Sequence, residues 1–220
     1  MRLIAIILLL FFSYTVFSQN CHCPSGQPFC ENGTPIKVFL FSNKKSLGIC
    51  GYLEVKHKDT TYSGIALYKC GENKIIDDWG EIQSCKVRKV ADTLLIEELY
   101  GLPIGENFNE VSIPFYINKY FFKVNDLQQK GYYRKDIKKY SKAQIRQVLE
   151  KYKKLRKENS EHNVAVANML FWAYVSGSKE AEVYLKSMPE KIGPFDGAIA
   201  EEWDDISATY EHWKEKNKRN

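Results

Sequence analysis

The sequence predicts an α+β protein in which a disulfide-stapled antiparallel β-domain precedes a C-terminal bundle of about four helices. Three observations carry this prediction. An apolar run at the N-terminus is followed by a group of cysteines, which is typical of exported proteins. Short apolar or alternating runs separated by turn residues fill residues 35–125, and from Ile137 onward apolar residues recur at helical spacing. We therefore expect the β-domain over residues 19–127 and the helical domain over residues 136–217.

The first 18 residues predict a signal peptide. Arg2 supplies a short positive region, residues 3–17 are almost entirely apolar, and Val16 and Ser18 stand where small or compact residues precede a cleavage point. No later apolar stretch is long enough to span a membrane. We expect a secreted or periplasmic protein that has no transmembrane segment once the signal is removed. Lipid attachment at Cys21 stays open, although the amide residues before it are unlike a lipobox.

Short runs in the first half of the chain predict five to seven strands. They are separated by turn sequences such as Asn43-Lys44-Lys45 and Gly105-Glu106-Asn107. Turns at such short intervals favour an antiparallel meander, sandwich or small barrel over βαβ units. The runs cover residues 36–41, 47–55, 62–68, 82–90, 93–99, 111–117 and 120–124.

Four helices are expected in the second half. Ser141 and Gln144 fit a capping box at the start of the first helix. The second, from about 161 to 175, is apolar around most of its circumference, which predicts a central, buried helix. A short amphipathic helix then stops at Pro189, and Asp196 caps the last one. The middle two, across a three-residue turn, resemble one helical hairpin of the HEAT type over about 28 residues; an ordinary helical hairpin explains the same spacing.

All six cysteines lie in the predicted β-domain. Six cysteines in an exported protein predict three disulfides, and the sequence leaves 15 connectivities open. The candidates are Cys21, Cys23, Cys30, Cys50, Cys70 and Cys85. The Cys21-His22-Cys23 group also contains good zinc ligands. Its spacing lacks the two-residue gap of zinc knuckles, and an oxidising compartment consumes thiols in disulfides. We therefore expect no metal site.

The early Cys21-x-Cys23, the Phe29-Cys30 pair and three later cysteines together are similar to the netrin-like module of tissue inhibitors of metalloproteinases. This resemblance implies a small β-barrel. It also implies that cysteines pair first to fourth, second to fifth and third to sixth. The pairs would be Cys21–Cys50, Cys23–Cys70 and Cys30–Cys85.

Positive charge is concentrated in one segment. Between Lys119 and Glu158 there are 14 basic and 4 acidic residues. A basic face beside several tyrosines is predicted to bind another protein or an anionic surface. It consists of Lys138, Lys139, Lys142, Arg146, Lys153 and Lys154. A solvated face, partly neutralised by acidic residues of the last helix, is the alternative. No nucleic-acid-binding motif accompanies the charge, so we expect no nucleic-acid partner.

No catalytic motif is present, and we expect neither catalytic residues nor a cofactor. The sequence favours an exported, non-catalytic protein that binds another macromolecule, as an inhibitor, immunity factor or envelope adaptor. One alternative is a secreted hydrolase that uses carboxylates near Asp77 and Asp78, next to Glu81; a solvated turn explains these residues as well. A second alternative is a structural envelope component that associates with itself.

Overall fold

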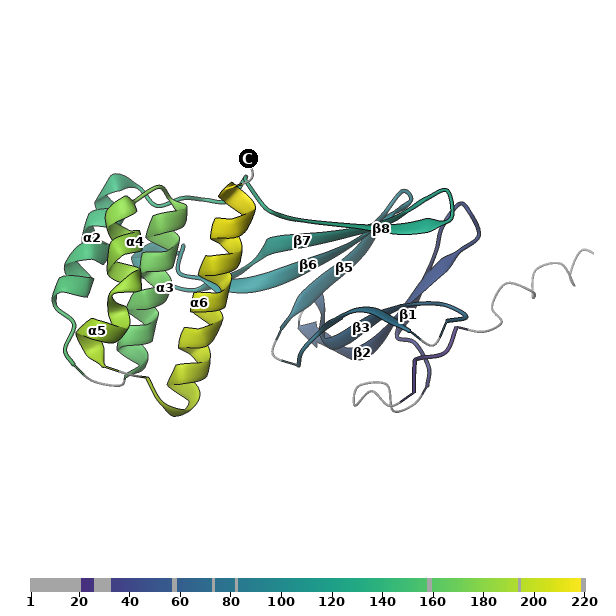
Figure 1. The fold of residues 1–220 in the computed structure, drawn as a ribbon, viewed down its shortest axis with the longest axis horizontal. Helices are drawn as coiled ribbons and strands as arrows, with labels where there is room; N and C mark the ends of the chain where they lie inside the picture. The colour runs from purple at the N-terminus through teal and green to yellow at the C-terminus, as the bar shows by residue number, and fades with distance from the viewer. Residues whose placement is uncertain are drawn as a thin grey trace, which may run out of the picture. The chain divides into compact units, whose positions relative to one another are not determined.

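The computed structural model describes residues 21–25, 33–56, 59–72, 74–81, 83–157, 160–193 and 195–218. The chain divides into two compact units (Figure 1). The β unit comprises Met1–Glu98 and Asn118–Lys130, and the helical unit comprises Leu99–Ile117 and Gly131–Asn220. The predicted signal peptide lies outside the described residues.

The mixed α+β composition, with an antiparallel sheet followed by helices, is confirmed. In the described chain eight strands form one sheet in the order β1-β2-β3-β5-β6-β7-β8, with β4 also paired to β3. The strands are β1 (Lys37–Leu40), β2 (Ser46–Lys56), β3 (Asp59–Lys69), β4 (Ile75–Trp79), β5 (Cys85–Val90), β6 (Thr93–Leu102), β7 (Val111–Lys123) and β8 (Asp126–Tyr133).

Two strands, β4 and β8, are missing from the sequence-based prediction. Strand β4 contains Asp77 and Asp78, where a solvated turn is expected from the sequence. Strand β8 has the sequence Asp-Leu-Gln-Gln-Lys-Gly-Tyr-Tyr, in which apolar residues do not alternate with polar ones. Pairing through main-chain hydrogen bonds does not need an apolar pattern, so side chains alone did not reveal these strands.

Both faces of the β2–β3 pair are buried along residues 47–50 of β2 and 62–68 of β3. Their inward side chains are fully buried in the core of the β unit: Leu47, Ile49, Ile65 and Leu67. Neighbouring residues face outward, because successive side chains in a strand alternate. On this outer face the ring of Tyr68 lies over Gly48, its cross-strand neighbour, and Tyr68 is itself fully buried.

Two disulfides hold the N-terminal segment against this outer face. Cys21 is bonded to Cys70 and Cys23 to Cys50, with Cα–Cα distances of 4.5 and 5.9 Å. The sulfur of Cys21 lies 3.4 Å from the hydroxyl oxygen of Tyr68. Cys23, Cys50 and Tyr68 form one buried cluster. The cross-linked segment therefore covers an aromatic ring that would otherwise face water.

This connectivity differs from the one implied by the netrin-like resemblance, because Cys21 and Cys23 have exchanged partners. Cys85, a predicted disulfide candidate, is instead a free thiol. Its side chain lies in the inner core of the β unit, whereas the cross-linked segment covers the outer face. Burial, and secondarily the charge of Glu98, raises the pKa of the Cys85 thiol. Cys30 lies outside the described residues.

The first and last hairpins of the sheet meet at their tips. The Nδ2 of Asn43 donates to the carbonyl of Val124 at 3.1 Å, and the Nζ of Lys45 donates to the carbonyl of Asn125 at 2.9 Å. Beside them Phe41 and Phe122 pack edge to face, with centroids 5.0 Å apart. The sheet is therefore curled within the β unit, so that β1 approaches the β7–β8 hairpin.

Five α-helices, rather than about four, lie in the described part of the helical unit. They are α2 (Lys142–Lys153), α3 (Glu161–Val175), α4 (Lys179–Lys186), α5 (Met188–Ile192) and α6 (Gly197–Lys218). The capping box of Ser141 and Gln144 is present at the start of α2. The additional helix is α5. Pro189, expected to stop the preceding helix, instead stands in the first turn of α5, where the missing N–H of proline costs no helical hydrogen bond.

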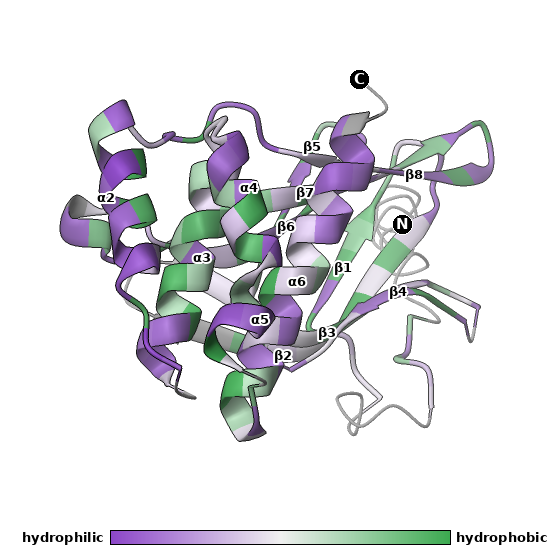
Figure 2. Cartoon of the chain, turned by 60° about the vertical axis from the view of Figure 1, so that its left-hand side comes forward, coloured by the Kyte–Doolittle hydropathy of each residue, from purple (hydrophilic) through white to green (hydrophobic). Residues whose placement is uncertain are grey.

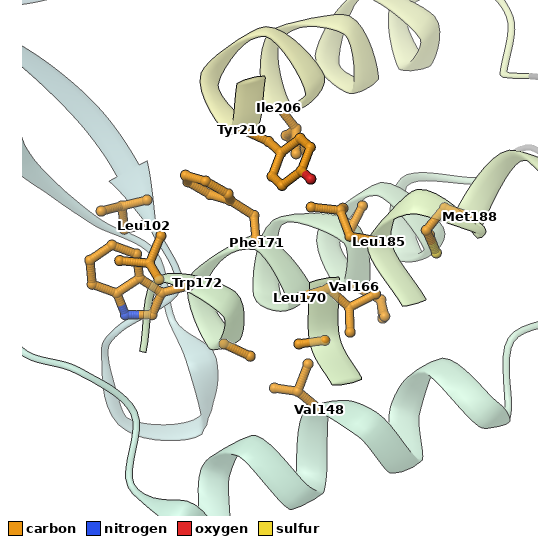
Figure 3. Close-up of a cluster of buried hydrophobic side chains, with 14 of the residues drawn as sticks. Leu102, Val148, Val166, Leu170, Phe171, Trp172, Leu185, Met188, Ile206 and Tyr210 are labelled. Carbon is orange, nitrogen blue, oxygen red and sulfur yellow. The ribbon is translucent and has the colours of Figure 1, made fainter. Parts of the chain in front are cut away.

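Helix α3 is the centre of the helical unit. Its residues Val166, Leu170 and Phe171 pack in a cluster of buried side chains from the surrounding helices (Figure 3). The cluster in that view also contains Val148 of α2, Leu185 of α4, and Ile206 and Tyr210 of α6. Helix α3 thus contacts α2, α4 and α6.

Strand ends complete this core. Phe115 of β7 is fully buried and makes ring contacts with Phe171, Trp172, Tyr133 and Trp213 at centroid distances of 4.8 to 6.1 Å. The helical unit therefore includes residues 99–117, which our domain boundaries assign to the β-domain.

Peptide mapping of the oxidised protein under non-reducing conditions tests the disulfide pattern. We expect one peptide pair linked through Cys21 and Cys70 and another through Cys23 and Cys50, because these are the sulfur pairs in bonding contact. Peptides linked through Cys21 and Cys50 would contradict the structure and restore the connectivity implied by the resemblance.

Substitution of Gly48 by alanine tests the packing of the outer face. The new methyl group would lie 2.3 Å from ring and hydroxyl atoms of Tyr68. We expect Gly48→Ala to lower the free energy of unfolding by about 1–3 kcal/mol, as overpacked sites do. Gly80→Ala is the matched control, since no atom lies within 4 Å of its added methyl. Equal denaturation midpoints for the two variants would contradict this packing.

Candidate functional site

A groove lies in the helical unit between α2 and the turn that joins α3 to α4. Its volume is about 580 Å³. The groove is lined by Tyr140, Lys142, Ile145, Arg146, Leu149, Glu150, Lys153, Ser176, Gly177, Ser178 and Glu180. Charged side chains of α2 therefore stand beside an apolar strip made by Ile145 and Leu149.

Helical spacing explains why α2 presents these side chains together. Lys142, Arg146 and Glu150 follow one another at four-residue intervals, and Lys153 is three residues further on. Residues three and four apart occupy the same face of a helix. Val148 and Tyr152 point to the opposite side and are buried in the core. Burying that side turns the charged stripe outward.

The other wall of the groove is fixed by hydrogen bonds of Ser176. Its hydroxyl accepts from the backbone N–H of Tyr140 at 2.9 Å and donates to the carbonyl of Trp172 at 2.7 Å. Tyr140 is buried and donates from its hydroxyl to the carbonyl of Pro103. Burial raises the pKa of Tyr140, which keeps the phenol neutral. Gly177 adopts a φ of 104°, which lets the chain turn directly into α4.

Three of the six predicted basic-face residues line the groove, namely Lys142, Arg146 and Lys153. The other three, Lys138, Lys139 and Lys154, are exposed but lie outside it. The sequence does not reveal that Ser176, Gly177 and Ser178 form a wall of the groove. It indicates only a turn between two helices at these residues. The wall's place in the groove depends on the hydrogen bond that joins Ser176, at the end of α3, to the backbone of Tyr140, just before α2.

The groove contains three cations, Lys142, Arg146 and Lys153, together with two carboxylates, Glu150 and Glu180. Within the parts of the chain that the structure describes, no ion pair shorter than 4 Å involves Lys142 or Arg146. Lys153 pairs with Glu150 at 2.8 Å. This hydrogen bond lowers the pKa of Glu150 and raises that of Lys153, but both groups are exposed, so water screens the attraction.

The acidic residues of the last helix, expected to neutralise the basic face, form no ion pair with it within 4 Å among the described residues. The carboxylates expected to neutralise the basic face, Glu201, Glu202, Asp204 and Asp205, are exposed on α6. No ion pair within 4 Å joins any of these to a basic residue among the described positions. Helix α3 packs against α2 on one side and against α6 on another.

The carboxylates proposed for hydrolysis do not converge. Asp77 and Asp78 are adjacent in β4, so their side chains point to opposite faces of the strand. Asp78 is exposed, and Asp77 accepts hydrogen bonds from Tyr120 at 2.5 Å and from Gln129 at 2.7 Å. Glu81, the third acidic residue of this group, is exposed. Asp77 thus has a structural role in joining β4 to β7 and β8.

The histidines are also separate. His22 and His162 are exposed, and His57 lies outside the described residues. His212 of α6 is half-buried and lies 2.9 Å, through Nδ1, from the hydroxyl of Tyr133. Its ring also packs against Tyr116 at a centroid distance of 4.8 Å. This histidine attaches α6 to strand ends rather than facing the groove.

Within the described residues, no three His, Cys, Asp or Glu side chains gather in a way that could hold a metal ion. No helix in the same part of the chain is long and apolar enough to cross a membrane.

Comparison with protein-family models, curated proteins and solved structures gave no significant match.

The contact of His212 predicts a pH dependence of stability. Burial, and next the charge of Lys216, lowers the pKa of His212 below its ordinary value of 6.5. Below pH 6.5 the unfolded chain gains a proton that the folded chain resists, so stability is retained above this pH and lost as the pH falls further. His212→Gln keeps a hydrogen-bonding side chain without titrating there. We expect its urea midpoint to fall less between pH 7.5 and pH 5.5 than that of the unsubstituted protein. Equal slopes would contradict this assignment.

Proposed function

We propose that this protein is an exported, non-catalytic binding protein that holds an acidic segment of another macromolecule in the groove beside α2. The observation that carries the proposal is the groove itself, in which Lys142 and Arg146 stand unpaired within the described structure beside an apolar strip. Export is supported by the two disulfides, since such bonds persist mainly in oxidising compartments.

The lining of the groove indicates the chemistry of its ligand. The Arg146 guanidinium can donate two parallel hydrogen bonds to one carboxylate, and Lys142 supplies a compact positive charge. Ile145 and Leu149 offer apolar contact in the same groove. A peptide segment in which acidic and aliphatic residues alternate satisfies both features. Opposite charge would speed its association and exclude basic competitors.

An inhibitor, an immunity factor and an envelope adaptor would all use such a surface, and the partner's identity distinguishes them. The hydrolase alternative is less well supported, because Asp77 is held by Tyr120 and Gln129 while Asp78 faces solvent. Catalysis by two carboxylates needs both groups at one scissile bond.

Binding of a fluorescent peptide with alternating Glu and Leu residues to the mature, oxidised protein tests this proposal. We expect Arg146→Glu to weaken binding about tenfold or more, a loss of roughly 1.4 kcal/mol, because a carboxylate would then replace a cation in the groove.

Lys154→Glu is the matched control. It changes the net charge by the same amount at the exposed C-cap of the same helix but lies outside the groove. We expect it to weaken binding less than about threefold, through the long-range field alone. Equal losses in the two variants would reduce the interaction to net charge and refute a specific groove.

A further inference from the structure

The five charged residues that line the groove are unevenly distributed along it. Lys142 and Arg146 belong to the first half of α2, whereas Glu150 and Lys153 belong to its second half. Glu180, in the first turn of α4, adds a second carboxylate. Figure 2 shows hydrophobic segments among the hydrophilic ones of α2. The groove is therefore not uniformly basic.

Contacts at the two ends of the groove show how α4 lies along α2. Just before these helices, the backbone N–H of Tyr140 donates to the hydroxyl of Ser176. At the far end the ring of Tyr184 stacks on that of Tyr152, with centroids 4.2 Å apart. Glu180 precedes Tyr184 by four residues and so shares its side of α4. A hydrogen bond with Glu180 raises the pKa of Tyr184, in agreement with this position. Glu180 therefore belongs to the far end of the groove.

The two ends consequently differ in charge. Neither Lys142 nor Arg146 has an ion pair within 4 Å among the described residues. At the far end Lys153 pairs with Glu150 at 2.8 Å. Glu180 has no ion pair within 4 Å in the same parts of the chain, so one carboxylate exceeds the cations there. At about 1.5 Å per residue, Glu150 is about 6 Å from Arg146 and about 12 Å from Lys142 along the axis of α2.

We propose that the groove prefers a dipolar peptide segment, in which an acidic residue binds at Lys142 and Arg146 and a basic residue binds at Glu180. This inference rests on the proposed function, because it refines the ligand of the same groove. An extended peptide advances about 3.3 Å per residue, so the two charges should stand about two to four positions apart. Aliphatic residues between them would contact Ile145 and Leu149. A second acidic residue at the far end would be repelled by Glu180.

Three fluorescent peptides of equal length test this preference with the mature, oxidised protein. One alternates Glu and Leu. The dipolar peptide has one Glu and one Lys three positions apart among Leu and Ser residues. Its isomer has the same composition with Glu and Lys adjacent, so its charges cannot reach both ends of the groove. We expect the dipolar peptide to bind about two- to fivefold more tightly than the isomer, as for an exposed charge pair. Equal affinities of the two isomers would overturn the proposal.

Glu180→Gln makes the test specific, because it removes the charge and keeps the size of the side chain. We expect this variant to bind the dipolar peptide about two- to fivefold more weakly, since the basic residue loses its partner. It should bind the alternating Glu-Leu peptide more tightly, since a repulsive charge is gone. Tight binding of the Glu-Leu peptide also shows that the variant is folded. A loss of affinity for both peptides alike would contradict a subsite for a basic residue.

Glu190→Gln is the matched control, since Glu190 is exposed and lies outside the groove. We expect it to leave both affinities unchanged. The proposed function and the dipolar preference fail differently. If the Glu-Leu peptide binds through Arg146 while Glu180→Gln acts no differently from Glu190→Gln, the groove function stands and the basic subsite is rejected. If the binding of neither peptide depends on Arg146, both proposals fail.

Discussion

Burial of α3 on nearly every side is the constraint on which the helical unit depends. Val164, Val166, Ala167, Leu170, Trp172 and Ala173 have no exposed surface, so α3 has no solvated stripe wide enough to face water. Other elements must cover it, and α2, α4, α6 and the strand ends do so. Because each covering helix buries its apolar side against α3, its charged side faces solvent. The charged stripe of α2 that borders the groove follows from this arrangement.

The β unit solves a similar problem by covalent means. Its β2–β3 hairpin has an inner face that packs in the core and an outer face on which Tyr68 lies against Gly48. No helix in the described part of the β unit covers this ring. The N-terminal segment does so, attached through Cys21 and Cys23. Disulfides stabilise such a short segment chiefly by restricting the unfolded chain. The Cys21-His22-Cys23 group is thus part of the scaffold.

Local signals in the sequence predicted a large part of this fold. The capping box at Ser141, the buried character of α3 and most strands could be inferred because each depends on neighbouring residues. Strands β4 and β8 could not, since polar side chains such as Asp77 and Gln129 form their contacts across the sheet. The cysteine pairing was beyond local reasoning because it depends on which face of β2 the N-terminal segment covers.

The candidate site was predicted only in part, for a related reason. A run of basic residues was visible in the sequence, but the separation of Arg146 in the groove from Lys154 outside it depends on the helical face each occupies. The wall at Ser176 depends on a hydrogen bond that the backbone N–H of Tyr140, 36 residues earlier in the chain, donates to the Ser176 hydroxyl.

Nuclear magnetic resonance titration of the isotope-labelled, mature protein with the alternating Glu-Leu peptide tests the central claim most directly. The backbone amides of residues 140–153 and 176–180 surround the groove, and their resonances should shift together and saturate at one peptide concentration. The amide of exposed Lys138, outside the groove, should shift little. Shifts confined to other surfaces, or small shifts at every lysine alike, would contradict a binding groove beside α2.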